Sequence, residues 1–254
     1  MTSFSANLGF LWTELSLPDA IRAAKAAGFD AVECHWPFDT PAQDVKAALD
    51  ETGLPMLGLN TRRGDLSQVE NGLAALVERE VDARAAIDEA LAYADEIGAQ
   101  CVHVMAGFAS GEEARQTFIA NLTYACKAAS QLGKTILIEP LNRHDAPGYF
   151  LQTTDQARDI IEHVGEANLK LMFDCYHIGR TEGDVATRAK ELLPFIGHIQ
   201  FASVPDRGPP DHGELDYWFV FSAFDTLGWT APLGAEYKPL GDTDSQLCDD
   251  EALR

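Results

Sequence analysis

The sequence lacks long apolar runs. No stretch approaches the ~20 consecutive apolar residues that a membrane helix requires. The first five residues, MTSFS, contain no basic region followed by an apolar segment, which a secretory signal would need. We therefore expect a cytoplasmic protein with no membrane partner.

Cysteine is scarce, and the five cysteines are an odd number. They form no CxxC pair and have no zinc-finger spacing. A complete disulfide framework needs an even number, and structural zinc sites need closely spaced ligand pairs. We expect free thiols in a reducing compartment.

Basic residues are few. Lys and Arg together number 19 against 40 Asp and Glu, which gives a formal net charge of -21. Such a charge repels nucleic acid and anionic membrane surfaces. An anionic small molecule would need a local cationic group or a metal ion to bind. These features predict no nucleic-acid partner.

Glycine-rich nucleotide-binding motifs are also absent, since no GxGxxG or GxxxxGK[ST] follows an expected strand. Strand-like and helix-like segments alternate eight times without a linker or a change in composition. The expected strands are 5–11, 31–34, 54–59, 101–105, 135–139, 169–174, 195–200 and 232–236. The expected helices are 16–28, 41–49, 81–97, 112–132, 154–164, 182–193 and 216–227.

Repeated strand–helix units predict parallel strands with helical crossovers. Eight of them in 254 residues favour a single α/β domain, residues 1–254. A closed (β/α)₈ TIM barrel is expected rather than an open doubly wound sheet. The polar segment 60–79 is expected to be a long loop that could close as a lid. The tail 241–254 is polar and short, so no final helix is expected there.

Four of the apolar strands end on an oxygen-bearing side chain. In chain order these are Glu139, Asp174, Gln200 and Glu236. Active sites of such barrels lie at the C-terminal ends of the strands, so consecutive strands would bring the four together. Carboxylate and amide oxygens suit Mg²⁺ or Mn²⁺ better than a thiophilic metal. The alternative is four unrelated strand-end residues that meet solvent or helix N-termini.

The segments around these residues resemble the hydroxypyruvate isomerase family, which belongs to the xylose isomerase-like TIM barrel superfamily. The resemblance covers nearly the whole chain. It is carried by SANL (5–8) followed by FL (10–11), IEPLN (138–142), FDCYH (173–177), HIQFA (198–202), VPDRG (204–208) continuing to GELDY (213–217), and GAEYKP (234–239).

The resemblance implies one divalent metal ion, held by the four strand-end residues. It also implies that Glu139 and Glu236 transfer protons. Related ketose epimerases have histidine where this chain has Gln200, which favours the hydroxypyruvate isomerase branch. By the same matching, His177 would hold a substrate oxygen and Arg207 would bind the polar end of the substrate. Asp145 stands where relatives often carry glutamate and would contact substrate as well.

The implied activity is that of a metal-dependent aldose–ketose isomerase, in carbohydrate or glyoxylate metabolism. Hydroxypyruvate would become tartronate semialdehyde through an enediolate, with the metal stabilising the developing oxyanion. A 2-oxo-tetronate isomerase or a ketose epimerase remains an alternative, because loop shape sets substrate length. A homodimer or homotetramer is possible. Two rivals come from other classes: a metal-dependent endonuclease on the same barrel, which the charge disfavours, and a catalytically silent sugar-binding barrel.

Three further polar residues lie at expected strand ends. His103 is expected to contact substrate, although a strand-end hydrogen bond is an equal alternative. The same two alternatives apply to Glu33 and His35 after the second strand. His198 lies inside the seventh strand, and we expect a core histidine whose ring nitrogens have partners.

Overall fold

The structure, a computed structural model, describes residues 2–68, 70–241 and 243. Within these residues, eight parallel strands form one sheet in the order β2-β1-β8-β7-β6-β5-β4-β3. The strands are β1 (Phe4–Asn7), β2 (Ala31–Glu33), β3 (Gly58–Asn60), β4 (Cys101–His103), β5 (Thr135–Ile138), β6 (Leu169–Asp174), β7 (Ile196–Phe201) and β8 (Leu233–Ala235).

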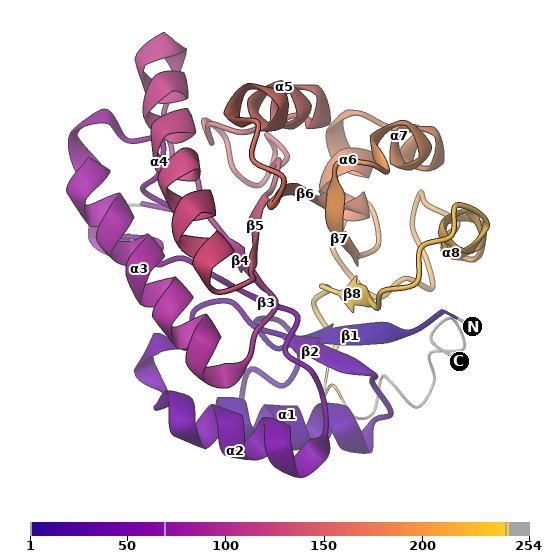
Figure 1. Ribbon diagram of the computed structural model, residues 1–254. Helices are drawn as coiled ribbons and strands as arrows, with labels where there is room; N and C mark the ends of the chain where they lie inside the picture. Colours follow the sequence, from indigo (N-terminus) through magenta and orange to yellow (C-terminus); the bar gives the residue numbers. More distant parts are fainter. Residues whose placement is uncertain (1, 69, 242, 244–254) are drawn as a thin grey trace.

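The sheet closes between β2 and β3. Val32 and Met56 form an isolated parallel bridge, and Val32 N donates to Pro55 O at 3.0 Å. Leu57 N donates to Val32 O at 2.8 Å. The strands therefore form a barrel with helices outside it, as Figure 1 shows, and the predicted fold class is confirmed.

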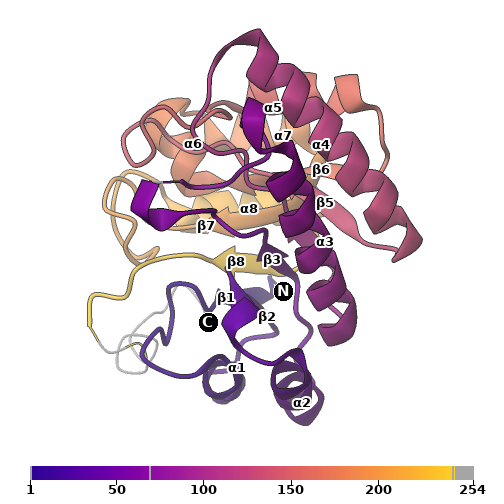
Figure 2. The ribbon, with the colours of Figure 1, turned by 90° about the vertical axis from the view of Figure 1, so that its left-hand side faces the viewer.

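The helices follow the strands in alternation and cover the outside of the barrel (Figure 2). They are α1 (Leu17–Ala26), α2 (Ala42–Thr52), α3 (Glu80–Ile97), α4 (Gly111–Gln131), α5 (Thr154–Val164), α6 (Cys175–Thr181), α7 (Val185–Leu192) and α8 (Tyr217–Thr226). Ser16 caps α1 by accepting a hydrogen bond from Asp19 N, and Pro18 lies in the first turn. Gly165 ends α5 with a φ of 69°, the left-handed conformation that glycine adopts without strain.

The first strand and the loop 60–79 differ from the sequence-based expectation. The first strand ends at Asn7 rather than at residue 11, because the chain turns there and Leu11 N donates to Asn7 O at 2.9 Å. The loop 60–79 contains two short 3₁₀ helices, Leu66–Gln68 and Val77–Arg79.

Helix α6 was not predicted. It begins immediately after β6, without an intervening loop, because Asp174 Oδ1 accepts a hydrogen bond from Tyr176 N at 2.8 Å and caps it. One residue therefore ends the strand and starts the helix, so the sequence offers no separate loop signal between them.

Four cysteines, Cys34, Cys101, Cys126 and Cys175, are free thiols, as expected. The fifth, Cys248, and most of the tail 241–254 lie outside the described residues, so the expectation about a final helix is not tested. Among the residues that are described, no helix combines the length and apolar character that a bilayer crossing requires.

Candidate active site

The four predicted strand-end residues lie at one end of the barrel. Glu139 directly follows β5, Asp174 ends β6 and Gln200 is the last residue but one of β7. Glu236 directly follows β8. Asp174 and Gln200 are register partners on neighbouring strands, and all four side chains are buried. Buried carboxylates need compensating partners, because an isolated buried charge is costly.

Three oxygen atoms of this group have no hydrogen-bond partner among the described residues. They are Glu139 Oε1, Asp174 Oδ2 and Gln200 Oε1. An unsatisfied buried acceptor costs about 1–3 kcal/mol, more when it is charged. A hard divalent cation such as Mg²⁺ or Mn²⁺ takes oxygen ligands of this kind and would satisfy all three. The residues present therefore fit the divalent metal that the sequence implies.

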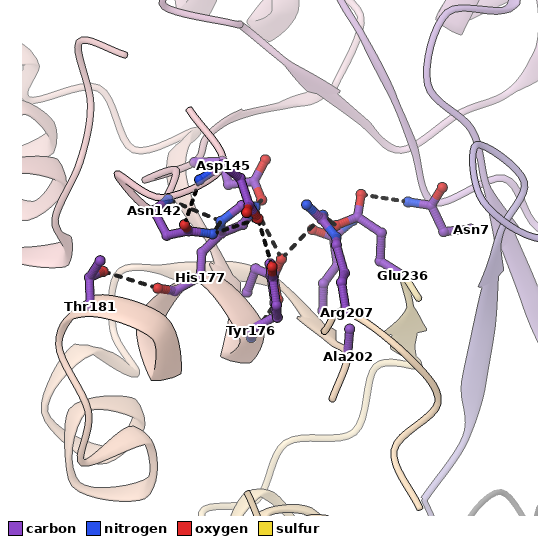
Figure 3. Close-up of polar contacts among 12 residues, drawn as sticks. Asn7, Asn142, Asp145, Tyr176, His177, Thr181, Ala202, Arg207 and Glu236 are labelled. Atoms are coloured by element: carbon purple, nitrogen blue, oxygen red, sulfur yellow. Dashed lines mark hydrogen bonds and ion pairs between the residues drawn. The ribbon is translucent and has the colours of Figure 1, made fainter. Parts of the chain in front are cut away.

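Glu236 differs from the other three because protein donors occupy both of its oxygens. Asn7 Nδ2 donates to Oε1 at 3.0 Å, and His35 Nε2 lies 3.0 Å from the same atom. Arg207 Nη2 donates to Oε2 at 2.5 Å. Figure 3 shows Asn7 and Arg207 approaching Glu236 from two sides. Burial alone would raise the pKa of Glu236, but Arg207 and His35 outweigh it and lower the pKa.

The pKa of Glu139 moves the other way. Burial raises it well above its ordinary value, and the neighbouring carboxylates of Glu236 and Asp174 raise it further. Burial and Glu236 likewise raise the pKa of Asp174 to about 7. The two glutamates predicted to transfer protons are therefore in electrostatically opposite environments, the pattern from which acid and base roles arise.

His177 lies in α6 beside Glu139 and Asp174. Its Nε2 is 3.7 Å from Glu139 Oε1 and 3.6 Å from Asp174 Oδ2, and one ligand atom from each of the three residues lies within 4.8 Å of the others. Asn142 N donates to His177 Nδ1 at 3.0 Å. Because Nδ1 accepts, the proton of the neutral ring is on Nε2.

This tautomer decides whether the ring of His177 binds a metal ion or a substrate oxygen. Burial and Arg207 lower the pKa of His177 to about 3, so the ring stays neutral. Its Nε2–H has no hydrogen-bond partner among the residues described. A protonated Nε2 is a donor and suits a substrate oxygen better than a cation.

Arg207 reaches the site from the loop after β7. Its guanidinium lies between two aromatic rings, 4.7 Å from the centroid of Phe10 and 4.9 Å from that of Tyr176. Arg207 Nη2 is also 3.7 Å from Asp174 Oδ2. Stacking on aromatic faces and contact with carboxylates together hold a guanidinium in one orientation.

Asp145 contacts the site residues through one oxygen. Its Oδ2 accepts hydrogen bonds from Tyr176 Oη at 2.6 Å and from Asn142 Nδ2 at 2.9 Å, as drawn in Figure 3. Burial raises its pKa, but these two donors outweigh burial and the net shift is downward. Asp145 therefore holds Asn142, which contacts His177, and Tyr176, whose ring lies against Arg207.

His103, predicted as a substrate contact, is buried at the end of β4. Its Nδ1 lies 3.7 Å from Glu139 Oε2, and neither ring nitrogen has a hydrogen-bond partner within the described part of the chain. Burial lowers its pKa to about 4. A neutral imidazole with two unused nitrogens next to a site carboxylate is available to a ligand.

Sequence reasoning missed four residues of the site: Asn7, Phe10, Asn142 and Tyr176. All four lie inside the segments that carry the family resemblance, which was the available signal. Their roles depend on contacts between distant parts of the chain. Asn7 and Glu236, for example, are 229 residues apart in sequence.

The loop that carries Arg207 is organised by Asp206. Asp206 Oδ1 accepts from Ser203 Oγ at 2.9 Å and from Gly208 N at 3.2 Å. His212 Nε2 lies 2.8 Å from Asp206 Oδ2. Hydrogen bonding to Asp206 and to Asp211 raises the pKa of His212.

We expect the imidazole of His212 to titrate above the ordinary histidine pKa, and its pKa to fall in Asp206→Asn. The folded-state pKa is raised, so the ion pair stabilises the protein fully below the unfolded pKa of about 6.5 and the gain is lost as pH rises through the folded pKa. Both side chains are partly exposed, so the gain is at most about 1 kcal/mol. An NMR titration of the imidazole proton measures the pKa, and an equal pKa in both proteins would contradict the assignment.

Comparison with known proteins agrees with this geometry. The model of the xylose isomerase-like TIM barrel family matches residues 21–249. A 2-oxo-tetronate isomerase of Cupriavidus necator is 45% identical over 251 residues, which cover 97% of this chain and 96% of that protein. A putative hydroxypyruvate isomerase of Xenopus laevis is 38% identical over 251 residues, 94% of this chain and 91% of that protein.

A solved structure described as an AP endonuclease, family 2, from Brucella melitensis superposes with a TM-score of 0.94. It is 35% identical and covers 97% of each chain. The barrel and its loops are therefore similar along almost their whole length.

Proposed function

The chain belongs to the xylose isomerase-like TIM barrel family as an aldose–ketose isomerase, and we propose that its substrate is a 2-oxo-tetronate, a four-carbon oxo-acid. Isomerisation would move the carbonyl from C2 to the neighbouring hydroxyl-bearing carbon. The higher identity to the 2-oxo-tetronate isomerase, 45% against 38%, supports this substrate over hydroxypyruvate. It reverses the order of preference that the sequence alone suggested.

The observation that carries the proposal is the arrangement of Glu139 and Glu236 around one set of oxygen ligands, with opposite pKa shifts. Glu139, Asp174, Gln200 and Glu236 would hold one Mg²⁺ or Mn²⁺. When bound, this ion supplies Lewis-acid polarisation of a substrate carbonyl.

The proton transfers fall to the two glutamates. One carboxylate takes the proton from the carbon that bears the hydroxyl group, and the other returns a proton to the former carbonyl carbon. The species between the two transfers is an enediolate, and the hydroxyl proton moves to the former carbonyl oxygen, so that the ketone and the alcohol exchange places. The Nε2–H of His177 donates to an oxygen of the substrate, because that donor is buried and has no other partner among the described residues.

Arg207 would bind the substrate carboxylate, since a guanidinium offers two parallel donors to a carboxylate. We expect Arg207→Ala to lower kcat/KM for 2-oxo-tetronates and hydroxypyruvate by about 10- to 100-fold, because a hydrogen bond to a charged group contributes about 1.5–3 kcal/mol. Neutral ketoses should also lose activity, because Arg207 lowers the pKa of Glu236, but substrates with a carboxylate should lose about 10-fold more. Steady-state kinetics on both substrate classes measures the difference, and equal losses would refute the assigned role.

A substrate panel tests the proposal as a whole. Hydroxypyruvate, the stereoisomers of 2-oxo-tetronate and free ketoses are incubated with the enzyme and Mn²⁺ in D₂O, and proton exchange at each carbon is followed by NMR. We expect exchange and isomerisation to be fastest with a 2-oxo-tetronate. Faster turnover of hydroxypyruvate would identify the three-carbon substrate instead, and exchange with free ketoses alone would indicate an epimerase.

A further inference from the structure

A buried charge pair lies inside the barrel, below the carboxylates. Glu33 ends β2 and His198 lies in β7, two residues before Gln200 and on the same face of the strand. Both side chains are buried, and His198 Nε2 is 2.5 Å from Glu33 Oε2. Buried ion pairs are weak contributors to stability, because desolvation offsets their attraction. The pair therefore calls for another explanation.

The second oxygen of Glu33 contacts Gln200. Gln200 Nε2 donates to Glu33 Oε1 at 3.4 Å. A carboxylate can only accept hydrogen bonds, so the end of the Gln200 amide that faces it must be the nitrogen. The amide oxygen then points away from Glu33. That atom, Gln200 Oε1, is one of the three buried oxygens with no partner among the described residues.

Gly234 provides the space in which these side chains meet. It is the register partner of Gln200 on β8. A Cβ at this position would lie 2.9 Å from Gln200 Cγ and 3.1 Å from His198 Nε2, and it would overlap Glu33 Oε1. Glycine weakens a strand interior unless something approaches closely, and here three polar side chains do so.

We propose that Glu33 and His198 are positioning residues for Gln200. Glu33 accepts the amide N–H and so holds the amide oxygen toward the carboxylates, while His198 occupies the other Glu33 oxygen and fixes its orientation. This inference rests on the proposed function, because the orientation of Gln200 matters only if its oxygen binds the divalent cation. Partners of this kind orient the groups that contact a metal and tune its affinity.

Mn²⁺ binding to substrate-free protein tests the inference without relying on turnover. Free Mn²⁺ is measured by electron paramagnetic resonance during a titration. In Glu33→Gln, residue 33 can present either an oxygen or an amino group to Gln200, so the amide orientation is no longer fixed. We expect Mn²⁺ affinity to fall by about 10- to 100-fold. Glu33→Asp retains the charge but withdraws the acceptor, and we expect a loss in the same direction.

A double-mutant cycle separates positioning from a general structural role. In a Gln200→Ala background nothing remains to be oriented, so either Glu33 substitution should change Mn²⁺ affinity by less than about threefold. Glu14→Gln is the matched control, because it makes the same chemical change as Glu33→Gln at an exposed turn position outside the site. Circular dichroism and thermal unfolding verify the fold of each variant.

The outcomes are distinct. Unchanged Mn²⁺ affinity in Glu33→Gln and Glu33→Asp would overturn the inference, and so would equal losses with and without Gln200. If Glu33→Gln does not fold, Glu33→Asp is compared in the two backgrounds by the same criterion. Failure of the wild-type protein to bind Mn²⁺ would instead overturn the proposed function.

Discussion

Glu139→Gln is expected to lower kcat by about 10²- to 10⁴-fold, the usual contribution of a positioned acid or base. In metal-free protein the same substitution should raise the free energy of unfolding, because the bound cation no longer offsets the repulsion between the carboxylates. Glu139 is buried beside two other carboxylates, which raise its pKa. An amide of the same shape removes that repulsion. Activity and stability would then change in opposite directions, the pattern typical of a residue kept for function.

Kinetics with 2-oxo-tetronate and thermal unfolding at neutral pH measure the two effects. Glu113→Gln, at an exposed position of α4, makes the same chemical change away from the site and should affect neither quantity. A Glu139→Gln enzyme that retains more than a tenth of wild-type kcat would contradict the assigned proton transfer.

Removal of divalent metal is expected to have an effect of similar size. After dialysis against a chelator, turnover should fall by about 10³-fold or more, since charge stabilisation by a metal contributes several kcal/mol to the barrier. Mn²⁺ or Mg²⁺ should restore it. The structural reason is that one oxygen each of Glu139, Asp174 and Gln200 has no hydrogen-bond partner in the described part of the chain.

The control is protein dialysed in parallel against the same buffer without the chelator. Restoration by both ions, with the better one identified by the slope of the titration, would support a hard oxygen site. Full turnover by protein with no measurable bound metal would remove the metal from the proposed function.

Periodicity and strand ends predicted the barrel well. Apolar runs that end in Glu139, Asp174, Gln200 and Glu236 are visible in the sequence because a parallel strand is buried on both faces and polar only where it leaves the barrel. The position of these residues in consecutive units was enough to predict that they lie at one end. The assignment of each role came from the family resemblance, and it stays a prediction.

The environment of each residue could not be predicted in the same way. The pKa of Glu236 depends on Arg207 and His35, which reach it from other strands. Likewise, of the two aromatic rings that enclose Arg207, that of Phe10 comes from the turn after β1 and that of Tyr176 from α6. Sequence spacing carries no information about such contacts, because they depend on how loops bend above the barrel.

Glu33 and His198 illustrate a partial prediction. The sequence analysis expected His198 to be a core histidine with satisfied partners, and its contact with Glu33 agrees with this. It left Glu33 open between a strand-end hydrogen bond and substrate contact. What it could not foresee is that Glu33 reaches His198 and Gln200 across 165 and 167 residues of sequence.

The closure of the barrel between β2 and β3 affects how the site residues next to it are held. This junction consists of one isolated bridge and a few backbone hydrogen bonds, whereas every other pair of neighbouring strands has at least two register partners. Glu33 is the last residue of β2 and His35 follows two residues later, so both lie next to this junction. Partial separation of β2 from β3 would therefore move both residues at once, and through them the groups that hold Gln200 and Glu236. The contacts between β2 and β3 therefore help to hold Gln200 and Glu236 in place through Glu33 and His35.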